Sequence, residues 1–390
     1  MTEIYLDNSA TTRISEQALA EYNRISRELY GNPSSRHRLG YLAESALSAA
    51  RAKLLCALSA RDGKMIFTSG GTEGNNLAIF GRAHAKARYR GCRIITTAGE
   101  HSSVSHTLAS LAGEGFDVQT VSTRDGVFDM ENFLSLLTPK TVLVTVMAVN
   151  NETGALYPLK KISEAVKRLA PEAVLHVDAT QSFMKIPFSP KSIGADMITV
   201  SSHKIEGPKG VGALWISDGL LKNKGLSPLL IGGGQEMGLR SGTENVPGAC
   251  AFAEAARLAA EHFAERYEKT AALRTYLLDG IAQSDLLSKE VTPNIPKGEC
   301  APHIVSLTVK GMKSETVLND LSGRGIYVSS GSACSSHDSA LSTALLAFGK
   351  SRDEADSTVR VSFSHRNTES DIDALLFALE DIVSSRAKKH

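Results

Sequence analysis

Short runs of β-branched and other apolar residues alternate with helical patterns in the middle of the chain. The strand-like runs are Arg93–Ala98, Thr141–Val149, Ala173–Ala179 and Ala195–Ser202. Near-continuous apolar runs of this kind suit parallel strands that are buried on both faces. Between them, residues 103–112 and 159–169 carry apolar positions on one helical face. Strands that alternate with helices predict right-handed crossover units and an α/β domain.

The pattern changes in the last third of the chain. A long helical stretch, from about Pro247 to Ile281, has the length and composition of a connector. Beyond it the sequence predicts strands and helices in mixed order, at Ile304–Val309, Ser314–Leu321, Val359–Phe363 and Glu369–Ser384. This order is typical of a smaller α+β domain.

Composition narrows the class of protein further. The 390 residues carry 43 Lys and Arg against 42 Asp and Glu, a net charge of +1, which does not favour broad nucleic-acid binding. The five cysteines are scattered and form no C-x-x-C pair, so neither a disulfide framework nor a zinc site is expected. No signal peptide and no apolar stretch of about 18 residues is found. We therefore expect a cytoplasmic protein that binds neither a membrane nor a metal.

A glycine-rich segment, Phe67–Asn76, lies between an apolar pair and a helical pattern at residues 77–88. Glycines with Ser and Thr at the start of a helix expose backbone N–H groups, which can bind an anion. An ordinary helix cap with a tight turn explains this segment equally well when it is taken alone.

Polar side chains follow two of the predicted strands, where α/β sheets bind ligands. Lys204 leaves one strand as a candidate Schiff-base nucleophile, and Asp178 ends another as a candidate partner of a pyridinium nitrogen. Taken alone, Lys204 could be a surface lysine and Asp178 a helix cap. Their joint occurrence with an anion-binding segment favours a phosphate-bearing aldehyde cofactor.

Five further residues are candidates for the site or the core. His101 could stack on a planar cofactor or act as an acid or base, and Asn151 follows the strand at 141–149; an ordinary loop histidine and a turn are the alternatives. Arg360 in a short apolar strand needs an anionic partner, either a substrate carboxylate or an internal carboxylate. Cys334 lies among small polar residues that would let a thiolate reach a substrate, whereas Cys56 is expected in the core.

The chain resembles the cysteine desulfurases of the NifS/IscS-like group, which are fold-type I pyridoxal-phosphate enzymes. The resemblance covers nearly the whole chain in order. It is carried by the segments YLDNSATT (5–12), YGNPSSRH (30–37), FTSGGTEGNN (67–76), EHSSV (100–104), VNNETG (149–154), HVDATQS (176–182), SSHKIEGPKG (201–210), GGGQEMGLRSGTENV (232–246) and SSGSACSS (329–336).

The resemblance implies a large α/β domain over residues 15–255, with a mostly parallel sheet between helices. It implies a small α+β domain made of residues 1–14 and 256–390. It also implies a homodimer that removes sulfur from L-cysteine, releases alanine and leaves a persulfide on Cys334 for a sulfur-acceptor protein. That acceptor would serve iron–sulfur cluster assembly or tRNA thiolation.

Residue roles are implied by the same resemblance. Lys204 would bond to the aldehyde of pyridoxal 5'-phosphate and shuttle protons, with His101 stacked on the ring and Asp178 at its nitrogen. Gln181 would approach the phenolic oxygen. The phosphate would be held by Gly71, Thr72, Ser201, His203 and, from the other subunit, Thr243. The substrate carboxylate would be bound by Asn32, Asn151 and Arg360, and Asn151 would also contact the cofactor.

Two departures from the family pattern bear on these roles. No Pro follows Cys334, so the reach of its loop and its partner are open. Ser362–Arg366 (SFSHR) replaces the usual Ser-Leu-Gly-Arg-Phe, which could alter packing at the substrate pocket. A selenocysteine lyase or an aminotransferase on the same fold, and a non-catalytic scaffold, are the alternatives. An aminotransferase would not need Cys334, and a scaffold would not need Lys204, Asp178, His101 and Cys334 together.

Overall fold

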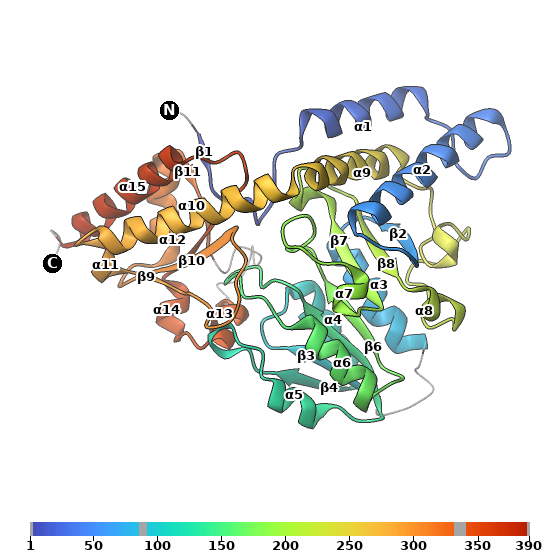
Figure 1. The fold of residues 1–390 in the computed structure, drawn as a ribbon, viewed down its shortest axis with the longest axis horizontal. Coiled ribbons are helices and arrows are strands. Elements are labelled where there is room, and N and C mark those ends of the chain that lie inside the picture. The colour runs from blue at the N-terminus through green and yellow to red at the C-terminus, as the bar shows by residue number, and fades with distance from the viewer. Residues whose placement is uncertain (1–2, 86–91, 331–340, 388–390) are drawn as a thin grey trace.

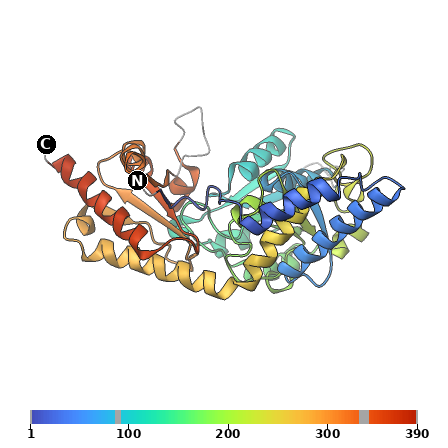
Figure 2. The same ribbon diagram turned by 90° about the horizontal axis from the view of Figure 1, so that it is seen from above.

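The computed structural model describes residues 3–85, 92–330 and 341–387, which form two domains side by side (Figure 1). We call the part built on a seven-stranded sheet the large domain and the part built on a four-stranded sheet the small domain. Helices α9 (Val246–Glu261) and α10 (Phe263–Gln283) run from the first to the second, as both views show (Figures 1 and 2).

The large sheet has the strand order β2-β8-β7-β6-β5-β3-β4. Its strands are β2 (Lys64–Thr68), β3 (Arg93–Thr97), β4 (Asp117–Val121), β5 (Thr141–Met147), β6 (Val174–Asp178), β7 (Met197–Ser201) and β8 (Gly212–Ile216). The strands from β4 to β7 are parallel, and β8 runs antiparallel to both of its neighbours. The predicted mostly parallel sheet is therefore confirmed.

Both faces of this sheet are buried. Successive residues of a strand point to opposite faces, so Val174 and Leu175 of β6 belong to two separate apolar cores. The helices that cover the faces are α1 (Glu16–Glu28), α2 (Arg38–Ala57), α3 (Gly71–Ala85), α4 (Ser102–Gly113), α5 (Met130–Leu136), α6 (Leu159–Leu169), α7 (Pro190–Ile193), α8 (Asp218–Lys222) and α9. This double burial is why the strands read as continuous apolar runs.

The small domain is built on the antiparallel sheet β12-β13-β10-β9. Its elements are β9 (Val291–Pro293), β10 (Ile304–Val309), β11 (Ile326–Tyr327), β12 (Ser329–Ser330), β13 (Thr358–Ser362), α10, α11 (Leu287–Glu290), α12 (Ser314–Gly323), α13 (Thr343–Phe348), α14 (Arg352–Asp356) and α15 (Glu369–Ala387). The N-terminus joins it, because β1 (Ile4–Tyr5) pairs with β11 and Leu6 lies in the core of this domain. The boundary at residue 255 stays a prediction.

Three local expectations differ from the structure. The connector is two helices, because the backbone turns at His262 (φ −107°, ψ 19°). Helix α3 begins at Gly71, so the glycine-rich segment supplies its first turn and does not precede it. Cys56 is exposed on α2 and not in the core, because it lies on the face of that helix opposite Leu54 and Leu47.

None of the helices in the described part of the chain combines the length and the apolar character that a bilayer crossing requires.

Candidate active site

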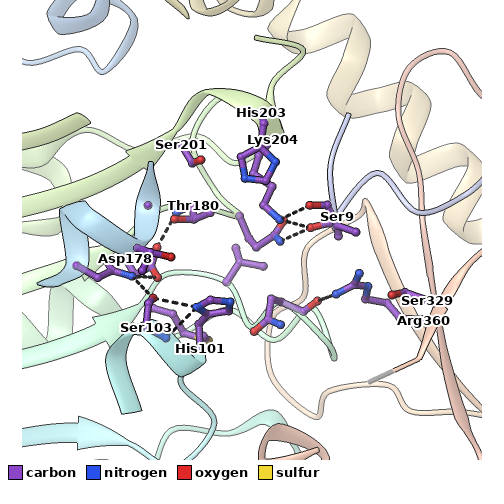
Figure 3. A pocket seen from close by; sticks show the side chains of 18 of the residues that line it. Ser9, His101, Ser103, Asp178, Thr180, Ser201, His203, Lys204, Ser329 and Arg360 are labelled. Atoms are coloured by element: carbon purple, nitrogen blue, oxygen red, sulfur yellow. Dashed lines mark hydrogen bonds between the residues drawn. The ribbon is translucent and has the colours of Figure 1, made fainter. Parts of the chain in front are cut away.

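A cavity of about 310 Å³ lies between the two domains, at the carboxyl ends of β6 and β7. Figure 3 shows Asp178, His101 and Lys204 at this cavity, with Arg360 and Ser329 facing them from the small domain. Most of the predicted site residues line it, namely Gly71, Thr72, His101, Asn151, Asp178, Gln181, Ser201, His203, Lys204 and Arg360. Their sequence positions are scattered, and the strand ends bring them together.

Asp178 ends β6 and is held by two hydrogen bonds. Asn75 Nδ2 donates to its Oδ2 at 2.8 Å, and the backbone N–H of Thr180 donates to its Oδ1 at 2.9 Å. The residue is only 5% exposed. A buried carboxylate that accepts two hydrogen bonds is fixed in place. It can still accept a further hydrogen bond from a protonated ring nitrogen in the cavity.

His101 caps helix α4 at the wall of the cavity. Its Nδ1 lies 2.9 Å from Ser103 Oγ and accepts from the backbone N–H of Ser103 at 3.2 Å. Burial lowers the pKa of His101, while the nearby Asp178 raises it. The lowered pKa favours a neutral ring, held in a fixed orientation against the cavity.

Lys204 follows β7 and is held by the N-terminal segment. Its Nζ donates to the backbone carbonyls of Ser9 at 2.6 Å and Ala10 at 2.7 Å. Its neighbour His203 contacts Thr11 Oγ1 at 3.2 Å, and burial together with the charge of Lys204 lowers the pKa of His203 to about 4. The amine of Lys204 therefore lies at the junction of both domains, beside a neutral imidazole.

One end of the cavity is shaped for an anion. Gly71 and Thr72 are the first residues of α3, where backbone N–H groups lack intrahelical partners. A Cβ on Gly71 would lie 2.9 Å from Thr180 Oγ1, so glycine allows the close approach of helix and strand end. Beside them, the buried hydroxyl of Ser201 has no hydrogen-bond partner among the described residues.

Gln181 adds a further polar group that points to a ligand. Its Nε2 donates to the Ser9 carbonyl at 2.8 Å, whereas its buried Oε1 has no partner within the described parts of the chain. Unpaired buried polar atoms are costly. The Ser201 and Gln181 oxygens therefore fit a bound group that carries a phosphate and a further polar substituent.

Arg360 faces this cavity from β13. Its Nη1 donates to the Asn151 carbonyl at 2.9 Å and its Nη2 to Asp7 Oδ1 at 2.9 Å, while Nε has no partner among the described residues. Burial raises the pKa of Asp7, and the charge of Arg360 lowers it. The internal carboxylate considered for Arg360 is thus present, and the guanidinium keeps free donor capacity for a second anion.

Two predicted residues, Asn32 and Thr243, do not line this cavity, and a third lies outside the described residues. Asn32 is exposed and accepts from the backbone N–H of Ser34 at 2.9 Å. Thr243 is exposed before α9 in this chain, and its predicted role belongs to a second subunit. Cys334 lies outside the described residues, between β12 and α13.

Several residues that shape the site were missed as individual candidates. Asn75 orients Asp178, Asp7 pairs with Arg360, and Ser9 binds both Lys204 and Gln181 through its carbonyl. All three lie in segments that carried the family resemblance, at 5–12 and 67–76. The resemblance marked the segments, but the contacts are long-range and became visible only in the fold.

Comparisons with known proteins find relatives that match nearly the whole chain. The family described as aminotransferase class-V matches residues 4–375. "Cysteine desulfurase IscS 1" of Archaeoglobus fulgidus is 36% identical over 97% of this chain and 96% of its own length. A solved structure named "NIFS-LIKE PROTEIN" is 36% identical, with a TM-score of 0.90 over 98% of this chain and all of that chain. A structure described as "SspA in complex with cysteine" is 30% identical, with a TM-score of 0.80 over 94% of this chain and all of that one.

The chain belongs to the class-V aminotransferase family, among the cysteine desulfurases of the NifS/IscS-like group. The similarity extends over both domains, so it includes the elements that carry Lys204 and Arg360.

Proposed function

We propose that the protein is a pyridoxal-phosphate-dependent cysteine desulfurase. The observation that carries this proposal is the convergence of Lys204, Asp178 and the anion-binding end of the cavity opposite Arg360. A reactive amine, a buried carboxylate, a phosphate cradle and a carboxylate-binding arginine suit an amino-acid substrate and an aldehyde cofactor.

The residues present fit this cofactor. Lys204 would hold its aldehyde covalently, Gly71, Thr72, Ser201 and His203 would hold its phosphate, and Asp178 would pair with the ring nitrogen. Gln181 would approach the phenolic oxygen, and His101 would stack on the ring. When bound, the ring supplies an electron sink for charge that develops at the substrate α-carbon.

The protein's own side chains would then position the substrate and move its protons. Arg360 and Asn151 would bind the carboxylate of L-cysteine, with Asn32 as a further carboxylate ligand. Lys204 would take the proton from the α-carbon, since it lines the same cavity as Arg360. Since Arg360 and Lys204 lie on different domains, substrate binding would bridge the two.

Cys334 would accept the sulfur. Its thiolate forms a sulfur–sulfur bond with the substrate while the carbon–sulfur bond breaks. The electron pair of that bond goes to carbon, and a proton completes alanine. The persulfide would then pass to an acceptor protein, in iron–sulfur cluster assembly or tRNA thiolation.

We further infer a homodimer in which Thr243 reaches the phosphate of the partner subunit. Support comes from its exposure in this chain. A reducing compartment such as the cytoplasm suits the four cysteines of the described residues, which are all free.

The test is to supply L-cysteine and a thiol reductant to the cofactor-loaded protein and to measure alanine and sulfide. Equal amounts of both are expected from the wild type, and almost none from Lys204→Ala. Pyruvate and ammonia in place of alanine would contradict a desulfurase. A protein that stays colourless with added cofactor, with no label fixed by borohydride, would favour a non-catalytic role.

A further inference from the structure

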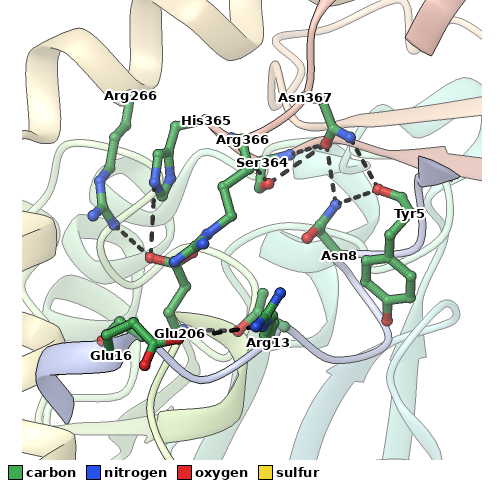
Figure 4. Close-up of polar contacts among 12 residues, drawn as sticks. Tyr5, Asn8, Arg13, Glu16, Glu206, Arg266, Ser364, His365, Arg366 and Asn367 are labelled. Carbon is green, nitrogen blue, oxygen red and sulfur yellow. Dashed lines mark hydrogen bonds and ion pairs between the residues drawn. The ribbon is translucent and has the colours of Figure 1, made fainter. Parts of the chain in front are cut away.

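A cluster of charged side chains surrounds Glu206, at the boundary between the two domains (Figure 4). Arg366 Nε lies 2.6 Å from Glu206 Oε1, and Arg266 Nη1 lies 3.4 Å from Oε2. His365 Nε2 is 3.9 Å from the same Oε2. The Glu206 side chain is 7% exposed. A single nearly buried carboxylate thus binds two arginines of the small domain, one from α10 and one from the segment after β13.

Glu206 is two residues beyond Lys204, and its backbone also makes hydrogen bonds. Its N–H donates to Thr12 Oγ1 at 2.7 Å, and its carbonyl accepts from the N–H of Ser15 at 2.9 Å. Its φ of +66° is a conformation that residues with a Cβ adopt only when their surroundings compensate for it. Contacts on both sides of the residue therefore hold it in place.

The N-terminal segment links Glu206 to both ends of the active site. We call residues 7–15 the strap. The strap binds Arg360 through Asp7 at 2.9 Å, and it binds Lys204 through the carbonyls of Ser9 and Ala10. Its far end is tied to the loop of Lys204, where the N–H of Thr12 donates to the His203 carbonyl at 2.9 Å. Whatever holds this loop against the small domain also fixes the distance between Lys204 and Arg360.

We propose that Glu206 is a positioning residue, which binds Arg366 and Arg266 across the domain boundary and thereby sets the separation of Lys204 from Arg360. This separation must let Arg360 bind the substrate carboxylate while the amine of Lys204 reaches the adjoining α-carbon. Only this link to substrate binding rests on the proposed function. Two residues of the segment that departs from the family pattern, His365 and Arg366, contact Glu206.

Two variants test the proposal without a large change in volume. Glu206→Gln removes the carboxylate charge, and Arg366→Met removes its closest partner. The matched control is Arg93→Met, which breaks an Arg93–Asp117 ion pair of 2.7 Å between two strands of the large domain. Arg366→Lys retains the positive charge and serves as the conservative variant.

The first measurement uses cofactor-free protein, so it does not depend on activity. Hydrogen exchange of the strap amides, Thr12 and Ser15 among them, should be faster by about tenfold in Glu206→Gln and in Arg366→Met. The double variant should exchange no faster than Glu206→Gln alone, because that change already removes the carboxylate that Arg366 binds. Arg93→Met should leave the strap unchanged.

The second measurement is steady-state kinetics of the cofactor-loaded protein with L-cysteine. We expect KM to rise about tenfold in both variants, with a smaller change in kcat, and Arg366→Lys to recover most of the loss. A purely structural role would lower the melting temperature of Glu206→Gln and leave strap exchange and KM unchanged, which would overturn the proposal. If strap exchange is faster in the variants but the wild type shows no desulfurase activity, the contact between the domains is supported and the proposed function is contradicted.

Discussion

Asp7 and Arg360 form a nearly buried ion pair, with 2.9 Å between Oδ1 and Nη2. The pair joins the N-terminal segment to β13, across 353 residues of sequence. It leaves Nε of Arg360 without a partner in the described structure, so the guanidinium is held in place and can still receive a substrate carboxylate.

This arrangement predicts that Arg360→Lys impairs substrate binding. A lysine cannot donate to Asp7, the Asn151 carbonyl and a substrate carboxylate with the planar geometry of a guanidinium. We expect kcat/KM for L-cysteine to fall about 100-fold, which corresponds to about 2.7 kcal/mol. Arg324→Lys, on an exposed ion pair of the small domain, is the control and should change nothing. An Arg360→Lys enzyme with wild-type kcat/KM would exclude Arg360 from carboxylate binding.

Ser201→Ala should weaken cofactor binding. The buried Ser201 hydroxyl lines the anion-binding end of the cavity and has no hydrogen-bond partner within the described ranges of the chain. A hydrogen bond to a charged group contributes about 1.5–3 kcal/mol. The dissociation constant of pyridoxal phosphate should rise at least about tenfold, as measured by titration of cofactor-free protein. Ser192→Ala, in the exposed capping box of α7, is the matched control. Equal affinities of the two variants would show that Ser201 does not contact the phosphate.

Lys185 should make stability depend on pH in the alkaline range. Burial, with the charges of Lys204 and Arg360, lowers the pKa of Lys185 from 10.5 to about 7. Between these values the unfolded chain binds one more proton than the folded one, so stability rises with pH by about 1.4 kcal/mol per unit. The free energy of unfolding of the wild type relative to Lys185→Met should follow this slope between about pH 7 and pH 10.

Urea titrations of cofactor-free protein measure this difference, with the exposed Lys191→Met as control. The Lys185→Met variant should be the more stable one below pH 7, where the wild type must bury a charge. A difference between wild type and Lys185→Met that stays constant over the whole range would mean that Lys185 has an ordinary pKa.

Glu100 should make the free energy of unfolding fall, not rise, with pH, and at lower pH than Lys185 does. Its carboxyl is fully buried beneath His101, and burial raises its pKa from 4.5 to about 8. A raised carboxyl pKa contributes stability that is present below pH 4.5 and is lost as pH rises toward 8. Glu100→Gln keeps an acceptor for Thr97 Oγ1 and for the N–H of Met147. The variant should therefore gain stability relative to the wild type from pH 5 to pH 8, by about 1.4 kcal/mol per unit.

Chemical denaturation at pH 5 and at pH 8 suffices for this comparison. If Glu100→Gln differs from the wild type by the same amount at both values, the carboxyl is ionised throughout. Glu131→Gln, on the surface helix α5, provides the control.

The sequence predicted the elements that local pattern determines. Helix α6 spans Leu159–Leu169 as expected, because its apolar positions repeat with the helical period. The parallel strands were recognised because both of their faces are apolar. The turn at His262 was missed, since neither Gly nor Pro marks it in the sequence.

The site was predictable where a side chain has a distinctive chemistry, as for Lys204, Asp178 and Arg360, and where the segment carried a family resemblance. The contacts that orient these groups were not. Lys204 is held by backbone carbonyls 194 and 195 residues away, and any residue at position 9 or 10 would supply such a carbonyl. Nothing in the sequence distinguishes Glu206 from the rest of its segment, because its partners Arg266 and Arg366 lie in the other domain.

Sulfur transfer to Cys334 can be followed by mass spectrometry of a single turnover. The cofactor-loaded protein is mixed with one equivalent of L-cysteine without reductant, and the mass of the peptide that contains Cys334 is measured. We expect this peptide to gain one sulfur atom for each alanine released, and Cys334→Ala to release almost no alanine. Alanine and sulfide released by Cys334→Ala at the wild-type rate, with no sulfur on the wild-type peptide, would contradict sulfur transfer to this residue.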